Sequence, residues 1–430
     1  MISHPRQLAQ SANSPSLPAS KLQGSRWFAL GLLLAINLFN YIDRQVLAAV
    51  EPELRDAFFA PNDPNAMAVT GTLGSAFLIT YMLTAPALGW IADRFSRWVI
   101  IGCAVILWSL ASGGSGLAIS FTMLFATRVL VGIGEGGYGP AAPTILADLF
   151  SLEKRGQILA IFCAAIPVGS ALGYVVGGIV AAHLGWRWAF YLVTPPGLLL
   201  GVLCFLQRDP RTVDGERPAK SRAGLRDYLG LLRTRSYVLN CAAQTAFTFA
   251  IGGLGFWVAA YLRYRGRPDM EKSYFGLILV VAGLGSTLIG GWVADKLRQR
   301  YPGSYFLVSG MGMLLAFPFL VASLYIPFPL AWLFMFVAIF FAFLNTGPSN
   351  TALANVAPPA VRATAFAMNI LVIHLLGDVP AFPIIGYIGG HTNMNIAFLT
   401  VSGMMMISGL FWTFGAKFLA EDTAAVEHAR

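Results

Sequence analysis

The chain has 430 residues, of which 57% are hydrophobic and only 11% charged, and its mean hydropathy is +0.66. Ordinary soluble domains are roughly a quarter charged, so this composition excludes a soluble protein and predicts an all-α integral membrane protein. A transmembrane barrel is excluded as well, because its alternating segments of about ten residues are absent. The net charge of +9 does not indicate nucleic acid, since the basic residues gather in short loops between apolar runs.

Apolar runs of about 20 residues, the length that crosses a bilayer, predict twelve transmembrane helices. The polar, Ser/Pro-rich segment 1–25 precedes them and has the composition of a disordered cytoplasmic tail. Segment 419–430 follows them as a second tail. The twelve predicted spans are 26–50, 67–92, 98–118, 122–147, 156–182, 187–207, 237–263, 273–295, 303–325, 329–355, 362–390 and 393–418.

The hydrophilic segment 208–236 is the only long connection between spans, and it divides them into two six-helix halves, 26–207 and 237–418. Within this linker, leucines at positions i, i+4 and i+7 among basic residues predict a short amphipathic helix on the inner membrane surface. These leucines are Leu225, Leu229 and Leu232.

Lysines and arginines indicate how the spans are oriented, since cytoplasmic loops are richer in them than outer loops. Placing both termini in the cytoplasm puts most of the Lys and Arg outside the spans into cytoplasmic segments. We therefore expect cytoplasmic termini, in a bacterial inner (plasma) membrane. One outer segment is an exception to the rule, with Arg263, Arg265, Arg267 and Lys272.

A six-residue motif recurs in the two halves. Segment 89–94, after span two, reads Gly-Trp-Ile-Ala-Asp-Arg, and segment 291–296, after span eight, reads Gly-Trp-Val-Ala-Asp-Lys. Matching positions in halves of the same orientation indicate parallel repeats. An acid at a span end beside basic residues can pair across the halves and latch the inner side when the protein opens outward; a loop that only sets topology is the alternative. The predicted gate residues are Gly89, Asp93, Arg94, Arg97, Asp295, Lys296, Arg155 and Arg362.

Charged residues inside spans one and four predict the functional centre. Arg128 and Glu135 are seven residues apart, about two turns on one helix face. Asp43 and Arg128 both lie roughly 10 Å below the outer surface, so they can pair. Buried charges persist mainly where they face a partner or a polar cavity. We expect Arg128 to hold one carboxylate ionised while Glu135, with no evident counter-ion, exchanges a proton and couples protonation to the conformation.

That charged column has a static alternative, an ion pair that only ties spans one and four together. A buried ion pair is a poor source of stability, which favours coupling. Arg44 lies about 100° around the helix from Asp43. The sequence leaves open whether it faces the anionic head of a substrate or extends outward to the membrane surface.

Span eleven contains a second polar group. His374 and Asp378 lie one turn apart on one face, with Gly377 and Pro380, both unfavourable in helices, between and after them. The pair has no third ligand nearby in the sequence, so we predict a polar cavity contact or a pair that locks a kinked helix, and no metal or other cofactor. The full set of predicted cavity residues is Tyr41, Arg44, Gln244, Asn345, Asn369, His374 and Asp378. Hydrogen bonding between helices is the alternative for the amides.

At this point the chain resembles the major facilitator superfamily of secondary transporters. The signature loop of that superfamily has a Gly, three residues, an Asp, an Arg or Lys, and then a second Gly with further basic residues. Segment 89–97 matches it except that Ser96 replaces the second Gly. The resemblance covers residues 26–418 and implies a fold of two six-helix halves that expose a central site to each side in turn.

Three stretches resemble the Spinster group of lipid transporters within that superfamily. They are Asn40-Tyr-Ile-Asp-Arg44, Gly134-Glu-Gly136 and Ile373-His-Leu-Leu-Gly-Asp-Val-Pro380. The resemblance implies proton-coupled transport of an amphipathic lipid, such as a lysophospholipid or a sphingosine-1-phosphate-like molecule. It also implies that the charged positions of spans one and four carry the coupling. The first two stretches occur in organic anion symporters as well, so a proton symporter of small organic anions (sugar acids, carboxylates) is the alternative.

Other classes of function have less support in the sequence. An intramembrane enzyme would need a nucleophile with a base or a metal cluster, and no serine or cysteine is placed to complete the His374–Asp378 pair. A receptor-like sensor without transport stays open. We expect a monomer whose partners are its substrate, protons and membrane lipid.

Overall fold

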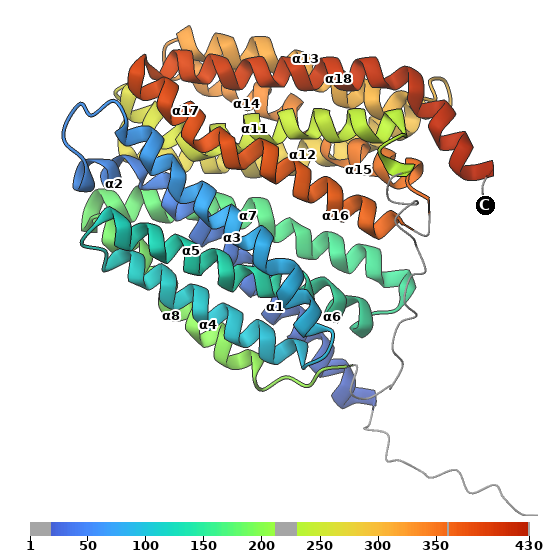
Figure 1. Cartoon of the computed structure of the whole chain (residues 1–430), viewed down its shortest axis with the longest axis horizontal. Helices are drawn as coiled ribbons and strands as arrows, with labels where there is room; N and C mark the ends of the chain where they lie inside the picture. Colours follow the sequence, from blue (N-terminus) through green and yellow to red (C-terminus); the bar gives the residue numbers. More distant parts are fainter. Residues whose placement is uncertain (1–18, 211–229, 359–360, 429–430) are drawn as a thin grey trace, which may run out of the picture.

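The computed structural model describes residues 19–210, 230–358 and 361–428, which form helices joined by short connections (Figure 1). The first half contains α1 (Ala19–Ala49), α2 (Glu51–Phe58), α3 (Ala66–Ala92), α4 (Arg97–Gly116), α5 (Phe121–Tyr138), α6 (Ala141–Leu149), α7 (Leu152–Leu184) and α8 (Trp186–Cys204). The second half contains α11 (Arg235–Tyr264), η1 (Asp269–Glu271), α12 (Lys272–Arg298), α13 (Ser304–Tyr325), α14 (Leu330–Phe343), α15 (Thr346–Val356), α16 (Arg362–Ile373), η2 (His374–Asp378), α17 (Val379–His391) and α18 (Met394–His428).

Among the described residues, ten helices are long and apolar enough to cross a membrane. They match ten of the twelve predicted spans. The other two predicted spans correspond to α1 and to α5 with α6, which are the helices that carry the charged column. Charged residues lower the mean hydropathy of a helix. The two spans that contain the charged column are therefore the ones that a criterion of length and hydropathy leaves out.

Several predicted limits differ from the structure. Helix α1 begins at Ala19, inside the segment predicted as a disordered tail, and α18 continues to His428, through most of the predicted second tail. Leu225 and Leu229 of the predicted amphipathic helix lie outside the described residues. Apolar periodicity shows where a helix must be buried, but a helix can continue past the membrane without an apolar face.

Close packing inside the first half depends on glycines of α7 that face α1, since small residues let two membrane helices approach closely. A Cβ added to Gly173 would lie 2.6 Å from the Ile42 carbonyl oxygen and from Gln45 Cβ. One added to Gly169 would lie 2.6 Å from the Leu38 carbonyl oxygen. The two backbones therefore touch along a line that larger residues would separate.

Gly173→Ala is expected to destabilise the protein by about 1–3 kcal/mol, because the methyl group overlaps the α1 backbone. Gly285→Ala in α12 is the matched control: its added methyl group would meet no atom within 4 Å, and alanine favours helix by up to about 1 kcal/mol. Thermal unfolding in detergent, followed by tryptophan fluorescence, compares the two. Equal midpoints would contradict this packing.

The two halves contact each other mainly at one end of the bundle. We call the end where α1 begins and α18 ends the terminal end, and the opposite end the distal end. Near the distal end α3 packs on α17: a Cβ on Gly71 would lie 2.6 Å from the Phe382 carbonyl oxygen, and the Ser75 hydroxyl donates to the Val379 carbonyl at 2.6 Å. Toward the terminal end the helices of the two halves diverge (Figure 1).

Ion pairs also join the halves at the distal end. Lys272 Nζ, on α12, lies 2.9 Å from Glu53 Oε1 on α2, and the lysine side chain is only 1% exposed. Arg263, at the end of α11, pairs with Glu53 at 3.1 Å and with Asp56 at 2.6 Å. Asp269 of the second half adds a contact to Lys272 at 3.0 Å. We call these five residues the distal lock.

The remaining basic residues of the cluster predicted to lie outside, Arg265 and Arg267, also have structural partners. Arg265 donates to the Leu324 and Ile326 carbonyl oxygens at 2.6 and 2.8 Å, where α13 ends, and Arg267 pairs with Glu271. The local exception to the distribution of positive charge is therefore explained by specific ion pairs and by capping of a helix end.

Candidate functional site

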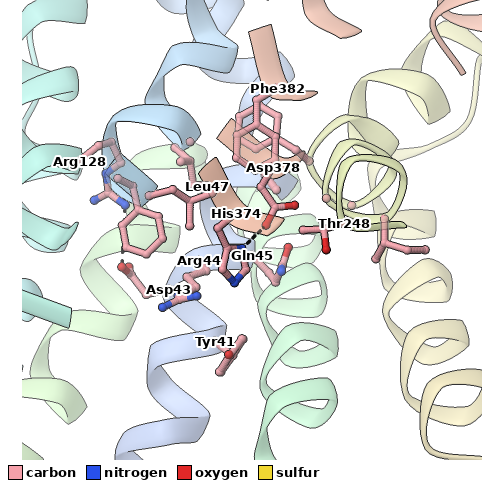
Figure 2. Close-up of a pocket in the computed structure, with 18 of the residues that line it drawn as sticks. Tyr41, Asp43, Arg44, Gln45, Leu47, Arg128, Thr248, His374, Asp378 and Phe382 are labelled. Carbon is pink, nitrogen blue, oxygen red and sulfur yellow. Dashed lines mark hydrogen bonds and ion pairs between the residues drawn. The ribbon is translucent and has the colours of Figure 1, made fainter. Parts of the chain in front are cut away.

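A central cavity of about 330 Å³ lies between the two halves. Charged and polar side chains of α1 and α5 form one wall, and side chains of α11, η2 and α17 form the opposite wall (Figure 2). Aromatic rings make up much of the remaining lining of this cavity. The lining includes Tyr41, Asp43, Arg44, Gln45, Phe77, Arg128, Phe247, Thr248, Phe256, Phe343, His374, Asp378 and Phe382.

The predicted pairing of Asp43 with Arg128 is confirmed. Arg128 Nη1 lies 3.8 Å from Asp43 Oδ2, and both side chains are at most 4% exposed. The Ser112 hydroxyl donates to the other carboxylate oxygen of Asp43, and Arg128 donates to the Ser115 hydroxyl. Helix α4, which contributes both serines, therefore holds the pair in position, a contribution that the sequence did not indicate.

Glu135 has a counter-ion, contrary to the sequence analysis. Arg44 Nη2 lies 2.6 Å from Glu135 Oε2, and Arg44 Nε donates to the same oxygen at 2.8 Å. Side chains on a helix lean toward its N-terminus, so Arg44 reaches back along α1 to the depth of Glu135, while Asp43 turns to Arg128. Arg44 thus neither extends outward nor stands free, and with 23% of its side chain exposed it lies at the cavity wall.

A second cavity of about 160 Å³ adjoins the first. Tyr41 and Arg44 line both cavities, so they form the boundary between them. Three aromatic rings surround the guanidinium group of Arg44, whose Cζ lies 5.0 Å from the ring centre of Tyr41, 4.8 Å from Phe77 and 5.4 Å from Tyr81. Cation–π attraction and the ion pair to Glu135 together hold this cation in place.

The opposite wall contains the predicted pair of span eleven. His374 Nδ1 lies 2.6 Å from Asp378 Oδ2 (Figure 2). The segment His374–Asp378 forms a π-helical turn, a wider turn that often marks functional positions in helices. Gly377 permits it to pack against α11, since a Cβ there would lie 2.9 Å from the Thr245 carbonyl oxygen. The sequence predicts a distortion here from Gly377 and Pro380; the π-turn is its form.

Three predicted cavity residues lie between helices and do not line the central cavity. Asn369 donates to Gln244 Oε1 at 2.7 Å, which ties α16 to α11. Asn345 donates to the Ala342 carbonyl of its own chain segment at 2.5 Å. All three side chains are buried. The Asn369–Gln244 bond matches the alternative role that the sequence leaves open, hydrogen bonding between helices. The Asn345 bond does not, because it stays within one chain segment.

Three predicted gate residues of the first half, Gly89, Arg94 and Arg97, make contacts within that half. Arg97 is buried and pairs with Asp209 and Asp148, each at 2.6 Å, and so joins α4 to α6 and to the segment after α8. Arg94 lies over the Trp90 ring at 3.6 Å, and a Cβ on Gly89 would contact Pro140 at 3.4 Å.

Three more gate residues have partners in their own half. Arg155 donates to the Ala147 carbonyl of α6, the Tyr305 hydroxyl donates to Asp295 at 2.8 Å, and Lys296 lies over the Trp292 ring. Arg362 begins α16. These residues lie at the terminal end, where the two halves diverge (Figure 1). A latch across the halves therefore stays a prediction for another conformation.

Comparison with known proteins identifies the family. The model of the Major Facilitator Superfamily matches residues 33–379. Protein spinster of Drosophila melanogaster is 32% identical over 97% of this chain and 74% of its own length. Sphingosine-1-phosphate transporter SPNS2 of Xenopus tropicalis is 30% identical over 93% of this chain and 81% of its own length.

The chain belongs to the major facilitator superfamily and, within it, to the Spinster family. The fold agrees: the crystal structure of a bacterial homolog of the human lysosomal transporter Spinster, inward-facing and unoccupied, has a TM-score of 0.79 at 22% identity and covers 94% of this chain and 98% of its own. A D-xylose–proton symporter has a TM-score of 0.73 at 18% identity, over 90% of this chain and 97% of its own.

Membership of the Spinster family makes this chain a multi-pass membrane transporter and not an enzyme. It also gives the two halves their role, since in this fold they expose the site between them to each side of the membrane in turn. The central cavity lies between those halves and contains the Asp43, Arg44 and Arg128 side chains.

Proposed function

We propose that this protein is a proton-coupled transporter of amphipathic lipids, such as lysophospholipids or sphingosine-1-phosphate-like molecules. One observation carries the proposal: the central cavity combines an aromatic, largely apolar interior with a cation, Arg44, whose only ion-pair partner among the described residues is a buried carboxylate. The aromatic part suits an acyl chain. The guanidinium suits an anionic headgroup, because it can pair with phosphate through two hydrogen bonds.

The same pair provides the coupling. Burial disfavours the ionised form of a carboxyl group unless a cation is paired with it. When an anionic headgroup attracts Arg44, Glu135 loses its counter-ion and takes up a proton; when the headgroup leaves, Glu135 releases the proton and Arg44 returns. Asp43 and Arg128 form the neighbouring pair, and protonation of Asp43 would leave Arg128 unpaired. Substrate binding at Arg44 and protonation of Glu135 are therefore coupled.

We propose the orientation that the loop charges predict, in which the terminal end faces the cytoplasm. In that orientation the distal lock closes the outer side, and the structure is in an inward-open arrangement. The predicted latch at residues 89–97 and 291–296 would then form in the outward-open state. The alternative, a carrier of small organic anions, would be supported by several cations on both walls of the cavity. Among the described residues, the lining from the second half provides only His374.

Uptake into liposomes with purified protein tests the substrate class. Under an imposed pH gradient we expect lysophospholipid to be moved well above the rate of protein-free liposomes, and sugar acids and small carboxylates to be moved no faster than in those controls. The reverse ranking would contradict the lipid assignment and support the organic anion carrier. Binding without flux of either class would support a sensor.

A further inference from the structure

Glu51, the first residue of α2, is a buried carboxyl group beside the distal lock, and its side chain is only 1% exposed. The Thr70 hydroxyl donates to Glu51 Oε1 at 2.7 Å, whereas Arg55 Nε lies 4.0 Å from that oxygen, too far for a hydrogen bond. The other oxygen, Oε2, is buried and has no hydrogen-bond partner among the described residues. Glu51 therefore lacks the close cation that each carboxylate of the distal lock has.

These surroundings favour the neutral form of the Glu51 carboxyl group. Burial raises the pKa of this group above its ordinary value and outweighs the opposing effects of Arg55, the Thr70 hydroxyl and Arg263. The neighbouring charge of Glu53 adds to the rise in pKa. An unpaired buried oxygen is also less costly on a neutral carboxylic acid than on a carboxylate.

Few other charges reach Glu51 from the helices that pack against α2, which are α1, α3 and α11. Helix α11 contributes Arg263, and α3 contributes the Thr70 hydroxyl but contains no Asp, Glu, Lys, Arg or His. On α1 the nearest charged residue in the sequence, Arg44, lies about 10 Å away along the helix. The remaining charged groups are those of α2 itself, Glu53, Arg55 and Asp56.

The burial of Glu51 depends on the closed distal end. Helix α11 packs on α2, and α17 packs on the beginning of α3, where a Cβ on Gly386 would lie 2.5 Å from the Met67 carbonyl oxygen. Both α11 and α17 belong to the second half. When the halves separate at this end, these helices move away, water reaches Glu51, and the carboxyl group regains its ordinary acidity.

We propose that Glu51 is a second proton-binding site of this transporter, which takes up a proton as the distal end closes and releases it to the same side as that end opens. The site goes beyond the proposed coupling at Glu135, because its proton does not cross the membrane. It senses the acidity of the solution at the distal end and sets how far that end closes. The inference requires only that the two halves alternate, and it holds for any substrate.

The sign of the response distinguishes this site from the ion pairs beside it. A proton that binds better to the closed state stabilises that state. The closed fraction therefore rises as pH falls through the raised pKa of Glu51 and levels off near the ordinary value of about 4.3. Protonation of Glu53, Asp56 or Asp269 would instead remove ion pairs of the distal lock and open that end. One proton changes the ratio of closed to open by at most about tenfold per pH unit.

Spin-label distances between the terminal ends of the two halves test the site over a pH series. Labels at the exposed positions Ser151 and Gln299 of the full-length chain in nanodiscs, with the four native cysteines replaced, should lie farther apart when the distal end is closed. We expect acid to increase the long-distance fraction with the slope of a single proton. Glu51→Gln is permanently neutral and should keep that fraction high at every pH. Glu421→Gln, which removes an exposed carboxylate of α18, is the matched control and should keep the wild-type response.

Thr70 provides a second test that keeps Glu51 in place. Thr70→Val has a similar shape but no hydroxyl, so the ionised carboxylate loses its hydrogen-bond donor and the response should move to higher pH by about one unit. Thr70→Ser retains the donor and should retain the wild-type midpoint. A midpoint that stays in place in Thr70→Val would show that Glu51 has only a structural role.

Neutralising Asp43 and Glu135 together separates this site from the proposed coupling. In that double variant a pH gradient should no longer drive accumulation, yet the conformational equilibrium should keep the response of Glu51. If the response disappears there, persists in Glu51→Gln or has the opposite sign, the second proton site is wrong while the coupling at Glu135 is untouched. If the response depends on Glu51 but gradient-driven accumulation continues in the double variant, the coupling is wrong and the site at Glu51 stands.

Discussion

Glu135→Gln is expected to abolish the pH dependence of transport. The amide has the shape of the carboxyl group but cannot ionise, so it mimics the protonated state permanently and no longer holds Arg44 as an ion-pair partner. Accumulation driven by a pH gradient should fall by at least about tenfold, equivalent to about 1.4 kcal/mol of coupling. Exchange of labelled for unlabelled substrate, which needs no net proton movement, should continue.

Asp43→Asn is expected to act in the same direction, because Arg128 then lacks the anion 3.8 Å away. Asp148→Asn is the matched control. Asp148 is a carboxylate of the same half that pairs with Arg97 outside the cavity, and Arg97 retains Asp209. The control should keep the pH dependence of the wild-type protein. If Glu135→Gln and Asp43→Asn both keep it too, the coupling assignment is wrong.

Lys272→Met is expected to shift the protein from the conformation with a closed distal end to the one with an open distal end. The methionine has a similar length but no charge, and Glu53, whose side chain is only 16% exposed, loses the ammonium group 2.9 Å away. Loss of one partner of a buried pair destabilises by about 3–5 kcal/mol. Because Arg263 still pairs with Glu53, we expect about 1–3 kcal/mol here, a shift of five- to 150-fold in the equilibrium.

Spin-label distances measure that shift. Ser151 and Gln299 are exposed on the terminal ends of the two halves, and labels there, with the four native cysteines replaced, should move closer when the distal end opens. Lys417→Met, which removes an exposed lysine of α18 that belongs neither to the distal lock nor to the predicted gate, is the control and should leave the wild-type distance distribution in place. An unchanged distribution in Lys272→Met would show that the distal lock does not set the equilibrium.

Much of the fold was predictable because lipid imposes simple rules on sequence. Every backbone polar group must be paired within a helix there, so long apolar runs identify helices directly. The repeated motif at 89–94 and 291–296 and the linker 208–236 then indicate two halves. The predicted helix ends were wrong near Ala19 and His428, because polar helix segments outside the membrane have no apolar periodicity.

The charged centre was predicted in part. The pairing of Asp43 with Arg128 followed from equal depth, a property that helical rise supplies. The pairing of Arg44 with Glu135 was missed because depth was assigned to Cα positions, whereas a long arginine side chain reaches more than one turn along the helix. Ser112 was missed as well, since a hydroxyl in a transmembrane helix usually bonds its own backbone.

Contacts between the halves could not be predicted from either half alone. Glu53 and Lys272 are far apart in the sequence, and their pairing depends on which end of the transporter is closed. One signal was present: four basic residues in a segment predicted to lie outside break the usual charge distribution, and such an exception suggests a local partner. The acids of α2, directly after the first span, were the available anions.

The central claim, that lipid movement is linked to proton binding at Glu135, is tested most directly by recording both fluxes in the same liposomes. A pH-sensitive dye inside reports protons while labelled lysophosphatidic acid reports the lipid. We predict that adding lipid to the wild-type protein changes the internal pH in proportion to lipid moved, and that Glu135→Gln exchanges lipid without any pH change. Lipid movement by the wild-type protein with no proton movement would contradict the account.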